Sequence, residues 1–360
     1  MPLLRIDLLV LLAAALILCQ AAAAADVDES HAVILLYHHV SEDTPASTSV
    51  SPALFESHLE YLAKHDYQVL PLANIVAALR NNSPLPARSV AITFDDAYES
   101  IITEALPRLI DRGWPFTVFV STDAIDERFG GFMSWDDLRR IESAGGTVAN
   151  HTQSHDHLVR RLPDESRAAW QQRVVSDIQF AEARLADELE HPAQLFAWPY
   201  GEFDAELESL ADGLGYTAFG QQSGPAGHSS NLQSLPRFPM AAGLASLDTP
   251  PEKMRSRPLP VTVLAPGSRI LAAKAAAPVL TMQIPEGPYR LDSLVCYVAG
   301  QEPARIQHNG DEIRVTARAA LRPGRGKFNC TAPSANESGV YYWYSYLWLQ
   351  PNADGSWYEE

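Results

Sequence analysis

Residues 89–97 read SVAITFDDA, and this stretch decides the fold. Five of its first six residues, Val90 to Phe94, are apolar or β-branched and predict a buried strand. The strand ends in two adjacent carboxylates, Asp95 and Asp96. Side chains of neighbouring strand residues diverge, so one carboxylate could bind a metal while the other reaches a water on that metal.

The chain around this strand alternates β-rich runs with helical patterns. We expect strands at 32–40, 89–97, 115–122 and 194–201, separated by helices at 54–65, 98–113, after Ser134, after Pro163 and at 204–214. Ser134 and Asp137 resemble a capping box. After Pro163, residues Trp170, Val174, Ile178, Ala181 and Leu185 form one apolar helical stripe. This alternation predicts an α/β fold with a parallel sheet, open or closed into a barrel, and function at the carboxyl ends of its strands.

The composition and the predicted secondary structure change after about residue 250. A Pro-rich, charged stretch, TPPEKMRSRPLP, is typical of a linker. β-type runs follow at 260–265, 278–284, 293–299, 312–319 and 340–350. We therefore predict a main domain over residues 26–250 and a small, sandwich-like β-domain over residues 251–360.

The first 25 residues have the layout of a cleaved secretory signal. Their apolar stretch is short for a membrane span, so we expect no stable membrane insertion after cleavage; lipid attachment at Cys19 is a minor alternative. Export to the periplasm or medium favours a disulfide between Cys296 and Cys330, the two cysteines left after cleavage. The net charge of −17 disfavours nucleic acid and anionic lipid as partners.

Three polar features of the first domain fall where strands end. They are Asp95-Asp96, the pair His151 and His155, and YHHV at 37–40. Two histidines four residues apart can bind one metal ion, and a carboxylate from another strand would complete a site with open positions for water and substrate.

Three ordered motifs, TFDDAY at 93–98, HTQSH at 151–155 and FAWPYG at 196–201, resemble the polysaccharide deacetylase family, also called the NodB-homology or carbohydrate esterase 4 family. The resemblance covers roughly residues 32–240 and implies a distorted (β/α) barrel. The run LLYHHV is similar to a permuted branch of exported poly-N-acetylglucosamine deacetylases. That branch implies an acetylated polysaccharide substrate and, as a partner, the polysaccharide machinery of an envelope or biofilm.

The resemblance also implies roles for single residues. Asp95 would be the general base, and Asp96, His151 and His155 would bind a divalent metal, commonly Zn²⁺, with Co²⁺ or Ni²⁺ as alternatives. The backbone N–H of Tyr200 would stabilise the tetrahedral oxyanion.

Two further roles are assigned among alternatives. For the general acid we favour His38 over His228, and over His39, whose side chain should point to the other strand face. The family's third motif usually begins with an Arg that orients the base, but Ala197 stands there. Arg237 is our candidate to replace it, against a plain structural ion pair.

The remaining aromatic and histidine residues have competing interpretations. Trp198 could bind a sugar ring or pack, Trp135 is expected in the core, and His157 is expected to be a solvated loop residue rather than a metal ligand. The cluster YYWYSYLWLQ at 341–350 is expected to pack, with a carbohydrate platform on one face as the alternative.

The resulting hypothesis is a metal-dependent hydrolase that removes N-acetyl groups from an N-acetylglucosamine-type polymer. The alternatives are a catalytically impaired polysaccharide-binding or assembly protein, suggested by the missing Arg, and an O-acetyl esterase on the same fold.

Overall fold

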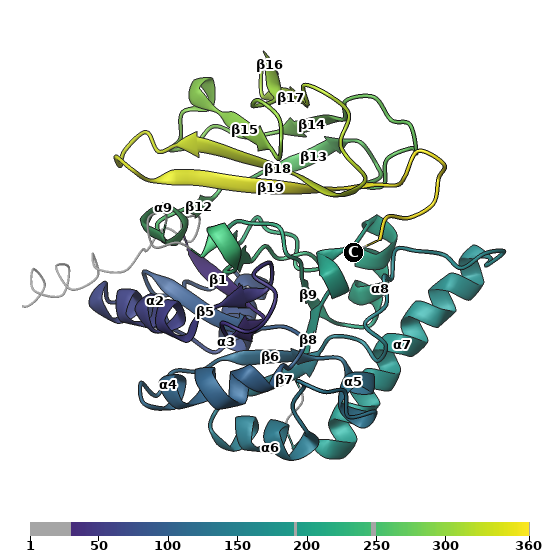
Figure 1. Cartoon of the computed structure of the whole chain (residues 1–360). Helices are drawn as coiled ribbons and strands as arrows, with labels where there is room; N and C mark the ends of the chain where they lie inside the picture. The colour runs from purple at the N-terminus through teal and green to yellow at the C-terminus, as the bar shows by residue number, and fades with distance from the viewer. Residues whose placement is uncertain (1–29, 191–192, 246–249, 360) are drawn as a thin grey trace, which may run out of the picture.

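The chain forms an α/β region (residues 30–245) and a β-region (residues 257–359) that pack on each other (Figure 1). The structure is a computed structural model and describes residues 30–190, 193–245 and 250–359. The expected signal and Cys19 lie outside the described residues. No helix in the described ranges combines the length and apolarity needed to cross a bilayer.

The α/β region is built on a curled, nine-stranded sheet with the order β10-β1-β5-β6-β7-β8-β9, in which β11 also pairs with β1 and β4 with β5. The strands are β1 (His31–Tyr37), β4 (Gln68–Val69), β5 (Ser89–Phe94), β6 (Thr117–Val120), β7 (Thr147–Asn150), β8 (Ala193–Ala197), β9 (Thr217–Phe219), β10 (Ala226–Gly227) and β11 (Phe238–Pro239). Two further short strands, β2 (His39–Val40) and β3 (Ser49–Val50), pair with each other. All pairs along the main path from β1 to β9 are parallel, as predicted.

β5 is buried along its whole length, because the sheet has packed residues on both faces. The helices are α2 (Pro52–Lys64), α3 (Leu72–Arg80), α4 (Leu106–Ile110), α5 (Thr122–Asp126), α6 (Trp135–Ser143), α7 (Arg167–Glu188) and α8 (Ala205–Gly213). A π-helical turn, Ile101–Ala105, precedes α4 in the segment where one continuous helix was expected. The sheet is curled but open, because β9 and β10 lie at opposite ends of the strand order.

Two helix predictions are confirmed. The five residues of the α7 stripe are all buried. Ser134 and Asp137 form the capping box at the start of α6.

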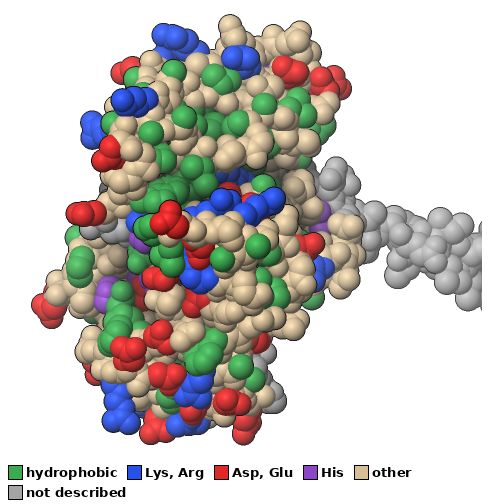
Figure 2. All heavy atoms as spheres, turned by 90° about the vertical axis from the view of Figure 1, so that its right-hand side faces the viewer, with side chains coloured by type: hydrophobic (Ala, Val, Ile, Leu, Met, Phe, Trp, Pro, Cys, Tyr) green, Lys and Arg blue, Asp and Glu red, His purple; other side chains and the backbone are tan. Residues whose placement is uncertain are grey.

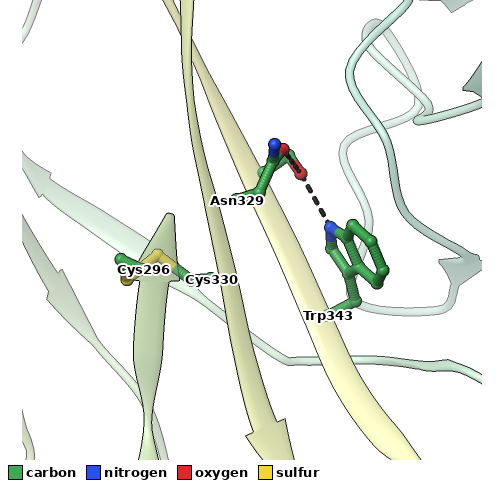
Figure 3. The surroundings of a disulfide bond; sticks show 5 residues. Cys296, Asn329, Cys330 and Trp343 are labelled. Atoms are coloured by element: carbon green, nitrogen blue, oxygen red, sulfur yellow. Dashed lines mark hydrogen bonds between the residues drawn. A yellow bond between two sulfur atoms is a disulfide. The ribbon is translucent and has the colours of Figure 1, made fainter. Parts of the chain in front are cut away.

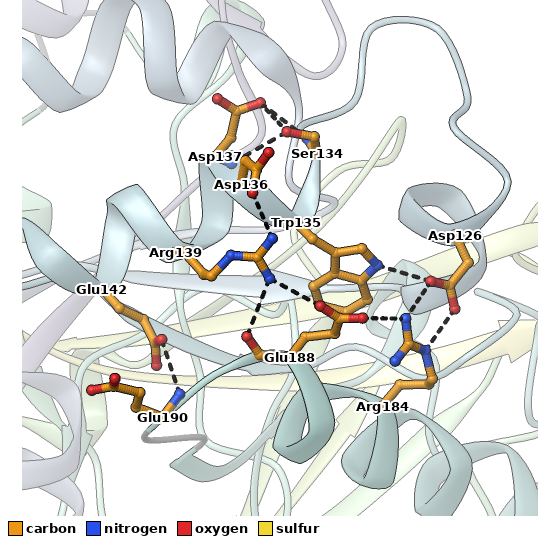
Figure 4. A network of polar contacts seen from close by, with 10 residues as sticks. All are labelled: Asp126, Ser134, Trp135, Asp136, Asp137, Arg139, Glu142, Arg184, Glu188 and Glu190. Atoms are coloured by element: carbon orange, nitrogen blue, oxygen red, sulfur yellow. Dashed lines mark hydrogen bonds and ion pairs between the residues drawn. The ribbon is translucent and has the colours of Figure 1, made fainter.

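A surface network ties α5, α6 and α7 together: the Trp135 indole donates to Asp126 at 2.8 Å, and Arg184 pairs with the same carboxylate at 2.7 Å (Figure 4). Trp135 is only partly buried against the core.

The β-region consists of two four-stranded sheets, β12-β19-β18-β15 and β13-β14-β17-β16. Their strands are β12 (Arg257–Pro258), β13 (Thr262–Ala265), β14 (Val279–Gln283), β15 (Val295–Val298), β16 (Arg305–Asn309), β17 (Glu312–Thr316), β18 (Gly324–Pro333) and β19 (Tyr341–Gln350). Cys296 and Cys330 are directly opposite each other on β15 and β18 and form a disulfide inside the core (Figure 3). The sandwich-like arrangement agrees with the prediction.

The two regions share apolar and polar contacts. Leu347 and Leu349 of β19 are buried in the same cluster as Trp198 and other residues of the α/β region. The Trp343 ring packs edge-on against Phe238 at 5.2 Å between ring centres. The Lys327 ammonium donates to the Gln221 carbonyl at 2.7 Å. The β-region is therefore seated on the α/β region rather than tethered beside it. The short helix α9 (Pro250–Met254) lies where the linker was expected.

Because Lys327 is buried where the two regions meet, we expect the free energy of unfolding to depend on pH. Burial lowers the pKa of Lys327 from 10.5 to about 8, with Arg325 adding to the effect. Between these two values the unfolded chain binds more protons than the folded chain, so stability should rise with pH across this window. Urea unfolding from pH 7.5 to 10.5 should show this rise relative to Lys327→Met. The exposed Lys274→Met is the control, and equal pH slopes for wild type and Lys327→Met would contradict the prediction.

Candidate metal centre

Four loops of the α/β region meet at the carboxyl ends of the parallel strands. Tyr37 is in register with Phe94, which places His38 and Asp95 directly after adjacent strand ends. His151 follows β7, and the loop with Tyr200 follows β8. Because parallel strands end at the same edge of a sheet, residues far apart in sequence converge there, as expected.

Asp96, His151 and His155 form a compact cluster. The Asp96 Oδ1 atom lies 3.3 Å from His151 Nε2 and 3.2 Å from His155 Nε2. One ligand atom from each of the three residues lies within 4.8 Å of the other two. Within the described ranges, no other group of His, Cys, Asp or Glu has this geometry.

The tautomer of His151 suits a metal ligand. Its Nδ1 donates to the Ala197 carbonyl at 2.7 Å, so Nε2 carries the lone pair and points at Asp96. A second partner of this kind fixes the ring orientation at metal sites. The His155 backbone has φ 57° and donates to the Thr152 hydroxyl at 2.9 Å, which holds the second imidazole in a left-handed turn.

These residues fit a divalent cation. Asp96 Oδ1 and His151 Nε2 are buried and have no hydrogen-bond partner within the described structure. Buried polar atoms without partners are costly, and a cation between them would satisfy both. Two imidazoles and a carboxylate suit Zn²⁺ and neighbouring transition metals. The same set leaves coordination positions for water and substrate.

Asp95 is held by a fully buried guanidinium. Arg237 donates to both Asp95 oxygens, each at 2.7 Å, and both side chains are 0% exposed. Arg237 also donates to the Gly220 carbonyl at 2.9 Å, which fixes its plane. Burial raises the pKa of Asp95, but the charge and hydrogen bonds of Arg237 together with the charges of His151 and His38 outweigh this, and the pKa lies below its ordinary value. The structure thus brings Arg237 to the carboxylate that the absent Arg at Ala197 would have served.

The three candidate acids lie in different places. Burial lowers the pKa of His38. The charges of Asp96 and Asp95 raise it and those of Arg237 and His151 lower it further, so His38 lies among the residues of the cluster. His39 is stacked on Tyr98, 3.6 Å between ring centres. His228 follows β10, which pairs with β1 at His31. That end of β1 is about 20 Å from His38 at the rise of a strand, so His228 lies away from the cluster.

Tyr200 forms the remaining wall of the site. Its backbone has φ 59°, and its carbonyl accepts a hydrogen bond from Arg325 of β18 at 2.9 Å. Its ring stacks on His157 at 3.8 Å and meets His155 edge-on at 4.6 Å. The β-region therefore contacts the loop beside the metal cluster directly.

Two expectations about neighbouring residues are wrong. Trp198 is 0% exposed and donates to the Gln233 carbonyl at 2.8 Å, so its ring has no free face for a sugar. His157 is not a solvated loop residue, because it stacks on Tyr200 and its Nδ1 lies 2.9 Å from the buried carboxylate of Glu202.

Sequence reasoning missed the partners of His157. Glu202 is 0% exposed and also accepts a hydrogen bond from Tyr358 at 2.5 Å. A Glu directly after the PYG motif was a visible signal for Glu202. Tyr358 had no signal, because it comes from the far end of the chain.

The pair of Asp95 and Arg237 predicts strong coupling. Arg237→Met leaves a buried carboxylate unpaired and should lower the free energy of unfolding by about 3–5 kcal/mol. Asp95→Asn leaves the buried Arg237 guanidinium without a charged partner and should also destabilise the protein. The double variant should cost clearly less than the sum of the two, as measured by urea unfolding in a chelator. Additivity within about 0.5 kcal/mol would contradict a direct interaction.

Comparison with known proteins agrees with this geometry. Residues 82–219 match the model of the polysaccharide deacetylase family. A poly-beta-1,6-N-acetyl-D-glucosamine N-deacetylase of Escherichia coli K12 is 26% identical over 244 residues, which are 58% of this chain and 36% of the relative. A Staphylococcus aureus protein of the same name is 27% identical over 170 residues, 46% of this chain and 58% of the relative. The chain thus spans about a third of the length of the E. coli relative.

Solved structures show the same fold. The Streptococcus pyogenes deacetylase PplD, in complex with acetate, superposes with a TM-score of 0.54 at 23% identity, over 60% of this chain and 94% of that one. The segment matched by the family model, residues 82–219, contains Asp95, Asp96, His151 and His155. Through its α/β region, this chain is therefore similar to the polysaccharide deacetylase family.

Proposed function

We propose that this protein is a metal-dependent hydrolase that removes N-acetyl groups from an N-acetylglucosamine-type polysaccharide. The observation that carries the proposal is the cluster of Asp96, His151 and His155, with two unpartnered buried atoms, beside an Asp95 held by Arg237. The names of the E. coli and S. aureus relatives support the choice of polymer.

The chain's own residues supply the acid–base chemistry. When bound, a divalent cation would supply Lewis acidity to a carbonyl or water oxygen at this site. Asp95 accepts the proton of the attacking water, and Arg237 keeps Asp95 ionised and fixes its plane. His38 donates a proton to the leaving amine nitrogen. The Tyr200 backbone N–H is the proposed donor to the developing oxyanion, and Arg325 holds the peptide group that follows it.

Localisation and domain division belong to the same proposal. We place the protein outside the cytoplasm, in the periplasm or medium, where the disulfide between Cys296 and Cys330 would persist. The polysaccharide machinery of an envelope or biofilm is the proposed partner. The division into a catalytic domain up to residue 250 and an accessory β-domain after it is supported by an apolar cluster that lies wholly within the β-region.

Two alternative functions remain to be separated from this one. A catalytically impaired binding protein was suggested by Ala197, but Arg237 occupies the position that such an Arg would serve, which favours activity. An O-acetyl esterase would use the same base and metal ligands. It would need the general acid less, because without protonation an alkoxide leaves far more readily than an amide anion.

Acetate release tests the proposed function. Metal-loaded protein should release acetate from β-1,6-linked N-acetylglucosamine oligomers, and chelation should abolish the release. Asp95→Asn should lose about 10²- to 10⁴-fold in kcat, the usual contribution of a general base, while still binding Zn²⁺ in calorimetry. The exposed Asp111→Asn is the control. Undiminished release by Asp95→Asn would contradict the assigned role, and no release from chitin, peptidoglycan or poly-N-acetylglucosamine fragments would reject the deacetylase.

Matched amide and ester substrates test His38. His38→Ala should lose about 10²-fold or more in kcat on the N-acetyl substrate and clearly less on an O-acetyl substrate, because only the amine needs protonation to leave. His39→Ala, next in the chain but stacked on Tyr98, is the control and should retain the ratio of the two rates. Equal losses on both substrates would assign the proton donor elsewhere.

A further inference from the structure

A cavity of about 460 Å³ lies where the β-region meets α9. Its lining residues define what we call the aromatic cavity: Glu252, Tyr297, Asn329, Thr331, Tyr341 and Trp343. We propose that the aromatic cavity binds a de-N-acetylated, cationic glucosamine unit of the polymer whose acetyl groups are removed at the metal centre. The inference rests on the proposed function and extends it to a second contact with the product.

The alternation of β19 separates packing aromatics from cavity aromatics. Tyr342, Tyr346 and Trp348 are buried in the core of the β-region. Tyr341 and Trp343 point to the opposite face and line the cavity. Tyr297 of β15 joins them and is 53% exposed. Packing was expected for this whole cluster, and Ser345–Gln350 are indeed buried from both strand faces, whereas Tyr341 and Trp343 are only partly buried. Exposed aromatic rings beside polar groups suit the apolar faces of pyranose rings.

A hydrogen-bond chain fixes a donor in this cavity. The Trp343 indole can only donate, and it donates to Ser345 Oγ at 2.9 Å. The Ser345 hydroxyl therefore gives its own proton to Asn329 Oδ1, at 2.7 Å (Figure 3). With its oxygen engaged in this way, Asn329 directs its NH₂ group away from Ser345. Asn329 and Thr331 thus bring an amide donor and a hydroxyl to an aromatic wall, as a sugar hydroxyl requires.

The charge of the cavity selects the ligand. Glu252 is the only one of the six lining residues that is charged at neutral pH. An ammonium group would pair with this carboxylate, whereas an N-acetyl group offers no charge to it. The net charge of −17 acts in the same direction at longer range. The chemistry therefore favours glucosamine over N-acetylglucosamine in this position.

One face of β18 connects the cavity to the metal centre. Arg325 donates to the Tyr200 carbonyl and Lys327 to the Gln221 carbonyl, both on the α/β region. Asn329 and Thr331 follow on the same face, since side chains alternate along a strand. At the rise of a strand, the cavity is about 13 to 20 Å from Arg325. In Figure 2, basic side chains (blue) gather where the upper and lower halves of the molecule meet. The strand that contributes Asn329 and Thr331 to the cavity thus also contacts the Tyr200 loop beside the metal cluster.

Oligomer binding tests the proposal. The probes are β-1,6-linked glucosamine and N-acetylglucosamine oligomers, titrated by calorimetry into full-length Asp96→Asn protein, which cannot assemble the metal centre. The glucosamine oligomer should bind more tightly. Tyr297→Ala should weaken its binding by up to about tenfold, the value of one aromatic contact. Glu252→Gln should weaken it by about 2- to 5-fold and leave the acetylated oligomer unaffected. Phe180→Ala, an exposed aromatic on α7, is the control, and thermal unfolding checks that each variant is folded.

Each result decides one point. Equal affinity for the two oligomers, or a Glu252→Gln variant that binds both as wild type does, would overturn the choice of a cationic ligand. Unchanged binding by folded Tyr297→Ala would overturn the cavity as the site. Binding as expected without acetate release by the wild type would reject the proposed function and leave the binding site standing. Acetate release without an effect of Tyr297→Ala on binding would reject only the cavity.

Discussion

The buried ion pair between Asp95 and Arg237 constrains the whole site. Two buried charges are tolerated only when they are paired and hydrogen-bonded. Here the two terminal nitrogens of the Arg237 guanidinium donate to the two carboxylate oxygens of Asp95. The pair ties the end of β5 to the segment that enters β11, and β11 in turn pairs with β1, which directly precedes His38. Asp95, Arg237 and the candidate acid His38 are therefore positioned by one set of strand contacts.

The β-region adds a second layer of constraint from outside the catalytic fold. The residues of β18 and β19 that face the α/β region supply Leu347 and Leu349 to its core and Arg325 to the Tyr200 loop. Near the chain's end, Tyr358 reaches Glu202 and, through it, His157. The loop with the left-handed Tyr200 is thus held from three sides, which keeps its backbone in a conformation that non-glycine residues seldom adopt.

Much of this structure could be predicted from local patterns in the sequence. The α7 stripe, the Ser134 cap and the parallel strand order follow from periodicity and end signals that lie within short windows of sequence. The convergence of Asp96, His151 and His155 follows from strand ends meeting at one edge. The burial of Trp198 and the environment of His157 could not be predicted, because both depend on segments far away, Gln233 and Tyr358. The π-helical turn before α4 has no signal that we can identify.

The position of Arg237 has a consequence for how such proteins are recognised and recombined. The segment matched by the family model ends at residue 219, whereas Arg237 and His38 lie on either side of it. A motif search confined to that segment would rate a chain without either residue as highly as this one. A chimera that transplants only the matched segment would keep Asp96, His151 and His155 but would lack Arg237, which holds Asp95, and His38, the proposed proton donor.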